Sequence, residues 1–228
     1  MSMTGYEPRC GDVGFTRDPG SALTPWTRWA TQARGEAETL ATHQFIVRDD
    51  VFLVQALRDG VSRRGCAAQI ADWQAAGVQL AVLRPPPVLM GPTTQARVMS
   101  RCDEMCGLSA AGGMAWRYSD AQLALCLLDG LLEKVIMESL RRLVFARTGG
   151  HVVLWRRLGR IIRTAVICSE TAAWPLLGSG IIPDWMRWAT PDDAWDWCAA
   201  QRRWQVVAMT PGWWGPRMVR YERNRVTR

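Results

Sequence analysis

The order of two short segments constrains the fold of this chain more than any other feature of its sequence. The earlier segment, Ala41–Val47, sets His43 at the start of an apolar run that predicts a β-strand. The later segment, Ala165–Glu170, ends an apolar run at Cys168, where a helix is predicted to begin. A helix N-terminus favours the thiolate form of a cysteine, and histidine is the usual base for such a thiol. The sequence therefore predicts a thiol–imidazole pair in which the histidine strand precedes the cysteine helix.

Hydrophobic periodicity and turn residues divide the rest of the chain into short elements. Asp49 and Asp50 form a predicted tight turn between two of the strands. Because several strands come first, helices lie between them and another strand precedes the cysteine helix, the expected class is α+β. Strands are predicted at 11–17, 43–48, 51–57, 60–64, 78–84, 164–167, 204–209 and 217–222, and helices at 21–34, 66–75, 94–107, 119–147 and 168–177.

Charge and cysteine content restrict the setting of the protein. The net charge of +7 comes almost wholly from arginine, since Lys134 is the only lysine. A basic surface suits an anionic partner, although scattered arginines also fit a biased codon composition. Seven cysteines form no disulfide framework, which favours reduced thiols and a reducing compartment. Cys102 and Cys106 lie one helical turn apart, but with two histidines in the chain we expect no zinc site.

Several kinds of segment and motif are not found in the sequence. No apolar run is long enough for a transmembrane segment, and no signal peptide is readable at the N-terminus. The sequence holds no phosphate-binding glycine loop, no serine nucleophile elbow and no specific nucleic-acid module. Because no signal peptide is readable, we expect the protein in the cytoplasm or in a multiprotein particle such as a virion, and not as a free secreted enzyme.

Four quoted segments together resemble a known group, the permuted papain-fold cysteine peptidases and amidases. These are the YiiX-like relatives of the NlpC-type cell-wall enzymes, and the wider superfamily includes lecithin:retinol acyltransferase. In this group the histidine strand precedes the cysteine helix. The resemblance implies a circularly permuted papain-like fold, in which a small antiparallel sheet or barrel packs on helices. The segments are Gly11–Phe15, Thr42–Val47, Val54–Val61 and Ile167–Glu170.

The resemblance also implies the roles of three site residues. Cys168 matches the nucleophile, His43 matches the base, and Gln55 stands where the third polar residue is expected. Many relatives have a glutamate near this position. A glutamine accepts a hydrogen bond from the imidazole but cannot stabilise imidazolium by charge. Neither a metal nor an organic cofactor is required by this chemistry.

The implied domain is single and spans residues 1–228, with a helical insertion at about 94–163 and a tryptophan-rich C-terminal extension at about 179–228. The implied function is hydrolysis of an amide bond, most simply in the peptide of bacterial peptidoglycan. A lipid ester or thioester hydrolase or acyltransferase is an alternative, because the apolar segment 123–145 could shelter an acyl chain. A third hypothesis is a structural component of a bacteriophage tail, in contact with other virion proteins.

Other residues have simpler interpretations. Asp12 is expected to be a buried carboxylate that caps a turn at the first strand. Glu170 fits a structural role or a substrate contact equally well, because the first turn of a helix favours a carboxylate. His151 follows two glycines in an arginine-rich segment and is expected at the surface. The C-terminal tryptophans could form a platform for sugar or lipid, but core packing is the default expectation.

Overall fold

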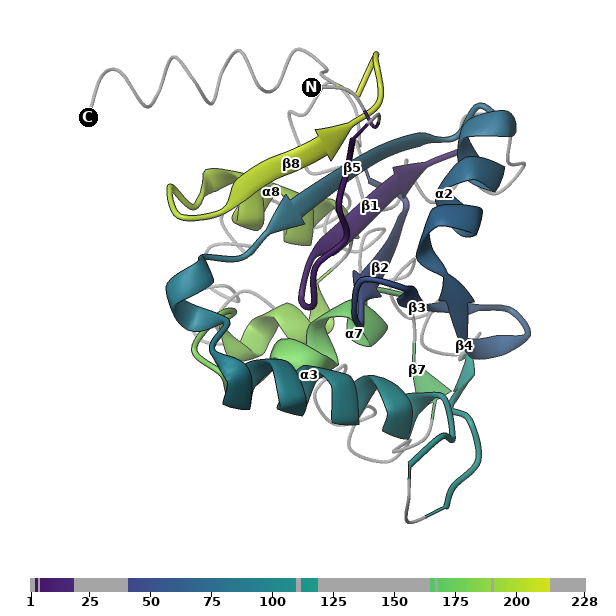
Figure 1. Ribbon diagram of the computed structural model, residues 1–228, viewed down its shortest axis with the longest axis vertical. Helices are drawn as coiled ribbons and strands as arrows, with labels where there is room; N and C mark the ends of the chain where they lie inside the picture. Colours follow the sequence, from purple (N-terminus) through teal and green to yellow (C-terminus); the bar gives the residue numbers. More distant parts are fainter. Residues whose placement is uncertain are drawn as a thin grey trace, which may run out of the picture.

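The computed structural model describes residue 3 and residues 5–18, 41–109, 112–118, 165–166, 168–189 and 191–213. Its centre is an open antiparallel sheet of six strands in the order β4-β3-β2-β1-β5-β8 (Figure 1). The α+β class is therefore confirmed, with an open sheet rather than a barrel. The strands are β1 Val13–Arg17, β2 His43–Val47, β3 Phe52–Leu57, β4 Gly60–Gly65, β5 Gln79–Arg84 and β8 Gln205–Met209.

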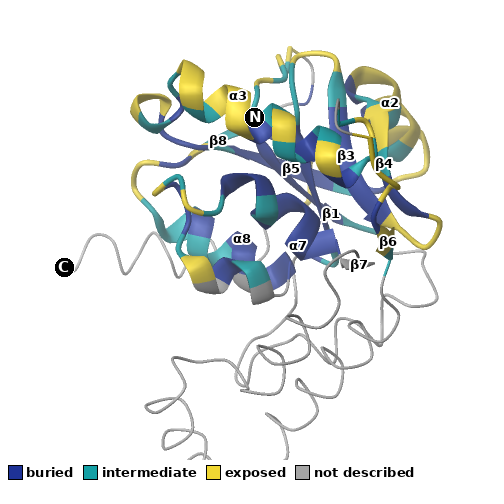
Figure 2. Ribbon diagram, turned by 90° about the horizontal axis from the view of Figure 1, so that it is seen from below, coloured by how far each residue is buried: buried dark blue, intermediate teal, exposed yellow. Residues whose placement is uncertain are grey.

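Helices cover both faces of the sheet. Helix α2 (Cys66–Ala75) lies on one face, while α7 (Cys168–Ala173) and α8 (Pro191–Ala200) lie on the other (Figure 2). Helix α3 (Pro92–Met105) runs past the ends of the strands at the bottom of Figure 1. Three short 3-10 helices and a two-stranded parallel sheet complete the described structure: η1 Pro87–Leu89, η2 Trp174–Leu176, η3 Asp184–Trp188, β6 Arg117–Tyr118 and β7 Ala165–Val166.

The larger core lies on the α7 and α8 face and is rich in aromatic side chains. Trp195 of α8 is buried and makes edge-to-face contacts with Phe15 and Trp213, with ring centroids 5.4 and 5.3 Å apart. Such pairs add directional attraction to the burial of apolar area. For these buried tryptophans, the expectation of core packing is confirmed.

The smaller core lies between the sheet and α2, and it depends on a glycine. Gly14 of β1 stands directly opposite Phe45 of β2, and a Cβ atom on Gly14 would lie 1.8 Å from the Phe45 ring. The absent side chain lets the ring lie flat across β1, where it also contacts Trp73 at a centroid distance of 5.0 Å. A larger residue at position 14 would displace this ring.

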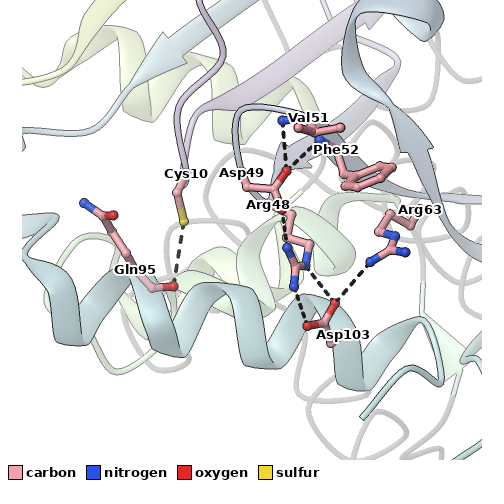
Figure 3. A network of polar contacts seen from close by, with 8 residues as sticks. All are labelled: Cys10, Arg48, Asp49, Val51, Phe52, Arg63, Gln95 and Asp103. Carbon is pink, nitrogen blue, oxygen red and sulfur yellow. Dashed lines mark hydrogen bonds and ion pairs between the residues drawn. The ribbon is translucent and has the colours of Figure 1, made fainter. Parts of the chain in front are cut away.

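Polar contacts fix the β2–β3 hairpin to α3 (Figure 3). Asp49 Oδ1 accepts hydrogen bonds from the backbone N–H groups of Val51 and Phe52, which confirms the predicted turn. Arg48 pairs with Asp49 and donates two hydrogen bonds to Asp103 of α3, at 2.7 and 2.6 Å. The hairpin is thus held at its closed end, which fixes the register of both strands.

Most predicted elements in the described residues are present within a few residues of the expected bounds. One differs: the predicted helix 168–177 is α7 followed by η2. Of the strand predicted at 164–167, the described residues 165 and 166 form β7, and the other two lie outside the described residues. The elements predicted at 21–34, 119–147 and 217–222 lie outside the described residues, as do His151 and the segment 123–145.

The segments predicted as an insertion and an extension both contribute to the main body. Val98, Cys102 and Met105 of α3 belong to the larger core, and β8 is an edge strand of the main sheet. Within the described residues, every helix is too short or too polar to cross a membrane. The six described cysteines are free thiols.

Candidate functional site

Two of the three predicted site residues contact each other. His43 begins β2 and Gln55 lies on the neighbouring strand β3, and the ring Nε2 of His43 is 3.1 Å from Oε1 of Gln55. Gln55 is 1 % exposed, whereas His43 is only partly buried. The pairing Phe45↔Gln55 sets the strand register, so that the histidine and the amide share one face of the sheet.

The third residue, Cys168, is the first residue of α7 and is buried. The backbone N–H groups of Gln44, Ser169 and Cys168 itself point to its sulfur. The N–H of Gln44 belongs to the peptide group that follows His43. It reaches the sulfur because the β2–β3 ladder stops at the Phe45–Gln55 pair and leaves the start of β2 without a partner in β3.

The three residues approach from different layers. Strand alternation places His43 and Gln55 on the α2 face, while Ala172 and Ala173 of α7 pack into the core of the opposite face. At the N-terminal end of α7, the Cys168 sulfur reaches the backbone N–H of Gln44 in β2. Among the described side chains, the ring of His43 is hydrogen-bonded to Gln55, and no hydrogen bond joins it to the thiol.

Burial sets the protonation states of both groups. It lowers the pKa of His43 to about 4, since it penalises imidazolium, and the hydrogen bond to Gln55 opposes this shift. Burial also raises the pKa of the Cys168 thiol to about 11, against the opposing effect of the three backbone N–H groups. At pH 7 the pair is therefore a neutral thiol and a neutral imidazole.

The raised thiol pKa departs from the expectation of a thiolate at the helix start. Burial raises the pKa of Cys10 and Cys106 to about 11 as well, and that of Cys66 to about 12. Because α7 has a single complete turn or little more, its dipole is small compared with the cost of burying a charge. Acidity alone does not separate Cys168 from the other cysteines.

Glu170 and Asp12 both have structural partners. Arg187 Nε donates a 2.7 Å hydrogen bond to Glu170 Oε1, and the carboxylate is 3 % exposed. The backbone N–H of Arg9 donates to Asp12, and Arg84 forms an ion pair with it. The expected turn-capping role of Asp12 is confirmed, and for Glu170 the ion pair favours the structural interpretation.

The sequence did not single out Gln69. It lies on α2, and its Oε1 accepts a hydrogen bond from Gln55 Nε2 at 3.2 Å. A glutamine on an amphipathic helix is common, and only the packing of α2 on β3 shows that it meets Gln55. The residues of the site thus include a chain of three polar side chains, His43, Gln55 and Gln69.

Two surface cavities of about 650 and 490 Å³ lie beside the N-terminal segment. Neither is lined by His43, Gln55 or Cys168. Both touch Arg84, which is already bound to Asp12. We assign no substrate to them.

Comparison of the chain with protein-family models, with curated proteins and with solved structures found no match.

Proposed function

We propose that this protein is a cysteine hydrolase of permuted papain-like fold that cleaves amide bonds, with peptides of the bacterial cell wall as the favoured substrate. One observation carries the proposal. Gln55 engages Nε2 of His43, and the sulfur of Cys168 lies at the N–H of the next residue, Gln44. The strand order, with histidine before cysteine, supports the same assignment.

The ring geometry supports Nδ1 of His43 as the atom that accepts the proton. Because Nε2 is held by Gln55, Nδ1 is the nitrogen left to accept a proton. Nδ1 is bonded to Cγ and is the ring nitrogen nearer the backbone, where the Cys168 sulfur also lies. The ring and the thiol approach β2 from opposite faces of the sheet, so the proposal requires that contact between Nδ1 and the sulfur forms when substrate is bound.

The proposed reaction proceeds in two halves. The Cys168 thiol transfers its proton to Nδ1 as the sulfur attacks the substrate carbonyl, and the imidazolium then protonates the leaving amine as the C–N bond breaks. A water molecule next attacks the thioester while Nδ1 accepts its proton, and the thiol leaves with that proton. In this proposal, the N–H groups of Gln44 and Ser169, which face the sulfur, would stabilise the oxyanion that forms beside it.

The neutral resting pair determines the type of catalysis. A thiol of pKa about 11 beside an imidazole of pKa about 4 does not form an ion pair at pH 7. Proton transfer must therefore accompany the attack, as in general-base catalysis. We expect slower turnover than an enzyme whose third residue is a carboxylate.

A structural role in a bacteriophage tail is the second candidate. The observation that favours it is the missing hydrogen bond between the thiol and the ring, together with the raised thiol pKa. In that case the three residues would serve only to pack the end of α7 on the sheet.

The test measures the release of free amines from peptidoglycan fragments. We expect Cys168→Ala to lower the rate at least about 10³-fold, because no other group supplies the nucleophile. Cys106→Ala is the matched control: its thiol has the same pKa of about 11 but lies just after the end of α3, and its loss should leave the rate unchanged. Equal rates in wild type and Cys168→Ala would exclude the proposal. Fatty-acid release from short-chain esters, with no amine release, would favour the lipid alternative, and no turnover on either substrate would favour the structural role.

A further inference from the structure

The half-buried side chain of Gln69 accepts a hydrogen bond from the buried amide of Gln55. Gln55 is 1 % exposed, and both ends of its side chain are bonded: Oε1 to His43 and Nε2 to Gln69. Ser62 lies directly opposite Gln55 on β4, but its buried hydroxyl has no hydrogen-bond partner. Among the described side chains, Gln69 is thus the one that bonds the Gln55 amide nitrogen.

A side-chain amide has an oxygen that accepts hydrogen bonds and an NH₂ group that donates them. The partner of one end therefore determines which end faces the next side chain. When Gln69 accepts from Gln55 Nε2, the oxygen of Gln55 must face His43. That oxygen can only accept, so Nε2 of the ring must carry the proton. Nδ1 is then the ring nitrogen with a free lone pair. If the Gln55 amide were reversed, its NH₂ group would require an unprotonated Nε2, and the proton would move to Nδ1.

We infer that Gln69 is a positioning residue of the proposed reaction: it fixes the orientation of the Gln55 amide and thereby the tautomer of His43 that leaves Nδ1 free to accept a proton. The catalytic meaning of this inference rests on the proposed function, whereas the tautomer itself does not. The tautomer can be observed in the resting protein.

The tautomer is measured by ¹⁵N NMR of the imidazole in a His151→Gln background, where His43 is the only histidine. We expect the Nε2–H form. Gln69→Glu offers only acceptor atoms to Gln55 and should keep this tautomer. Gln69→Lys offers only donors, so it should reverse the Gln55 amide and shift His43 to the Nδ1–H form. Ser62→Ala is the matched control on the same sheet face and should change nothing.

The same variants are assayed for amide hydrolysis. We expect Gln69→Lys to lower kcat on the order of 10³–10⁴-fold, as a wrong histidine tautomer does elsewhere, and Gln69→Glu to retain most of it. An Nδ1–H tautomer in the starting protein, or an unchanged tautomer in a folded Gln69→Lys variant, would overturn the inference. If Gln69→Lys does not fold, Gln69→Leu replaces it and should give a mixture of both tautomers; a pure Nε2–H form would then overturn the inference. A correct tautomer pattern without any hydrolysis would instead reject the proposed function.

Discussion

Two buried polar clusters on the same sheet use hydrogen bonds in opposite ways. Asp12 accepts bonds from Arg84 Nε and Nη2 at 2.8 Å each, from the Tyr6 hydroxyl at 2.9 Å and from the Arg9 backbone at 3.1 Å. Its side chain is fully buried, and its accepting positions are filled. The cluster is charged, saturated and closed to a further ligand.

The second cluster, formed by His43, Gln55 and Gln69, is neutral and open at one end. The Gln55 amide is bonded at both ends, and among the described residues the His43 ring is bonded through Nε2 alone. A remaining nitrogen on a partly exposed ring is what proton transfer requires. Both clusters bury polar groups, so burial by itself does not distinguish a candidate site from a structural cluster. The difference is that the second cluster keeps an unused hydrogen-bond acceptor, Nδ1 of His43.

The largest effect is expected from removing the carboxylate of the Asp12 cluster. Asp12→Ala leaves the partly buried Arg84 guanidinium without its counter-charge, and we expect a loss of about 3 kcal/mol or more in the free energy of unfolding. Urea unfolding followed by circular dichroism measures it. The control is Asp59→Ala, since Asp59 and Arg64 form an exposed pair at 3.7 Å and its removal should have no measurable effect. Similar losses in both variants would contradict the distinction between the clusters.

The second prediction tests the neutral cluster by acid. The folded state lowers the pKa of His43 to about 4 from 6.5, so stability is fully present above pH 6.5 and is lost as the pH falls towards 4. We expect His43 to contribute up to about 3 kcal/mol to this loss. Urea unfolding at pH 7 and pH 4 measures the loss of stability between the two pH values, and this loss should be smaller in His43→Asn than in wild type. The carboxylates titrate in both proteins, so their contribution cancels in the difference. Equal losses would show that the ring is solvated.

The local parts of the fold could be predicted from the sequence. Short apolar runs mark β2 and β3, the two aspartates mark the turn, and adjacency of the strands brings His43 to Gln55. These features depend on residues near each other in the chain. Apolar runs and turn chemistry carry that information.

The remaining parts depend on contacts between distant segments. Strand β8 pairs with β5, and Trp195 of α8 packs on Phe15 of β1, in each case across more than a hundred residues of sequence. The thiol pKa follows the same rule: the sequence shows the helix start at Cys168, but only the packed structure shows that burial outweighs the helix dipole there. Gln69 belongs to this class too, since its role comes from how α2 lies on β3.

The smallest expected effect comes from adding a negative charge to the neutral cluster of His43, Gln55 and Gln69, so that it resembles the charged Asp12 cluster. Gln55→Glu places a carboxylate on Nε2 of His43, and an adjacent opposite charge raises the pKa of the imidazole by at least about one unit, or about 1.4 kcal/mol. NMR titration of the His43 ring measures the pKa, and the acid limb of the rate profile should move to higher pH by the same amount.

Gln55→Met, which has no charge and no acceptor of similar strength, is the control and should lower the pKa of His43 further, because it removes the hydrogen bond that now opposes the effect of burial. An unchanged pKa in Gln55→Glu would mean that the ring and residue 55 separate in solution. In that event the hydrogen bond would not be available to orient the base.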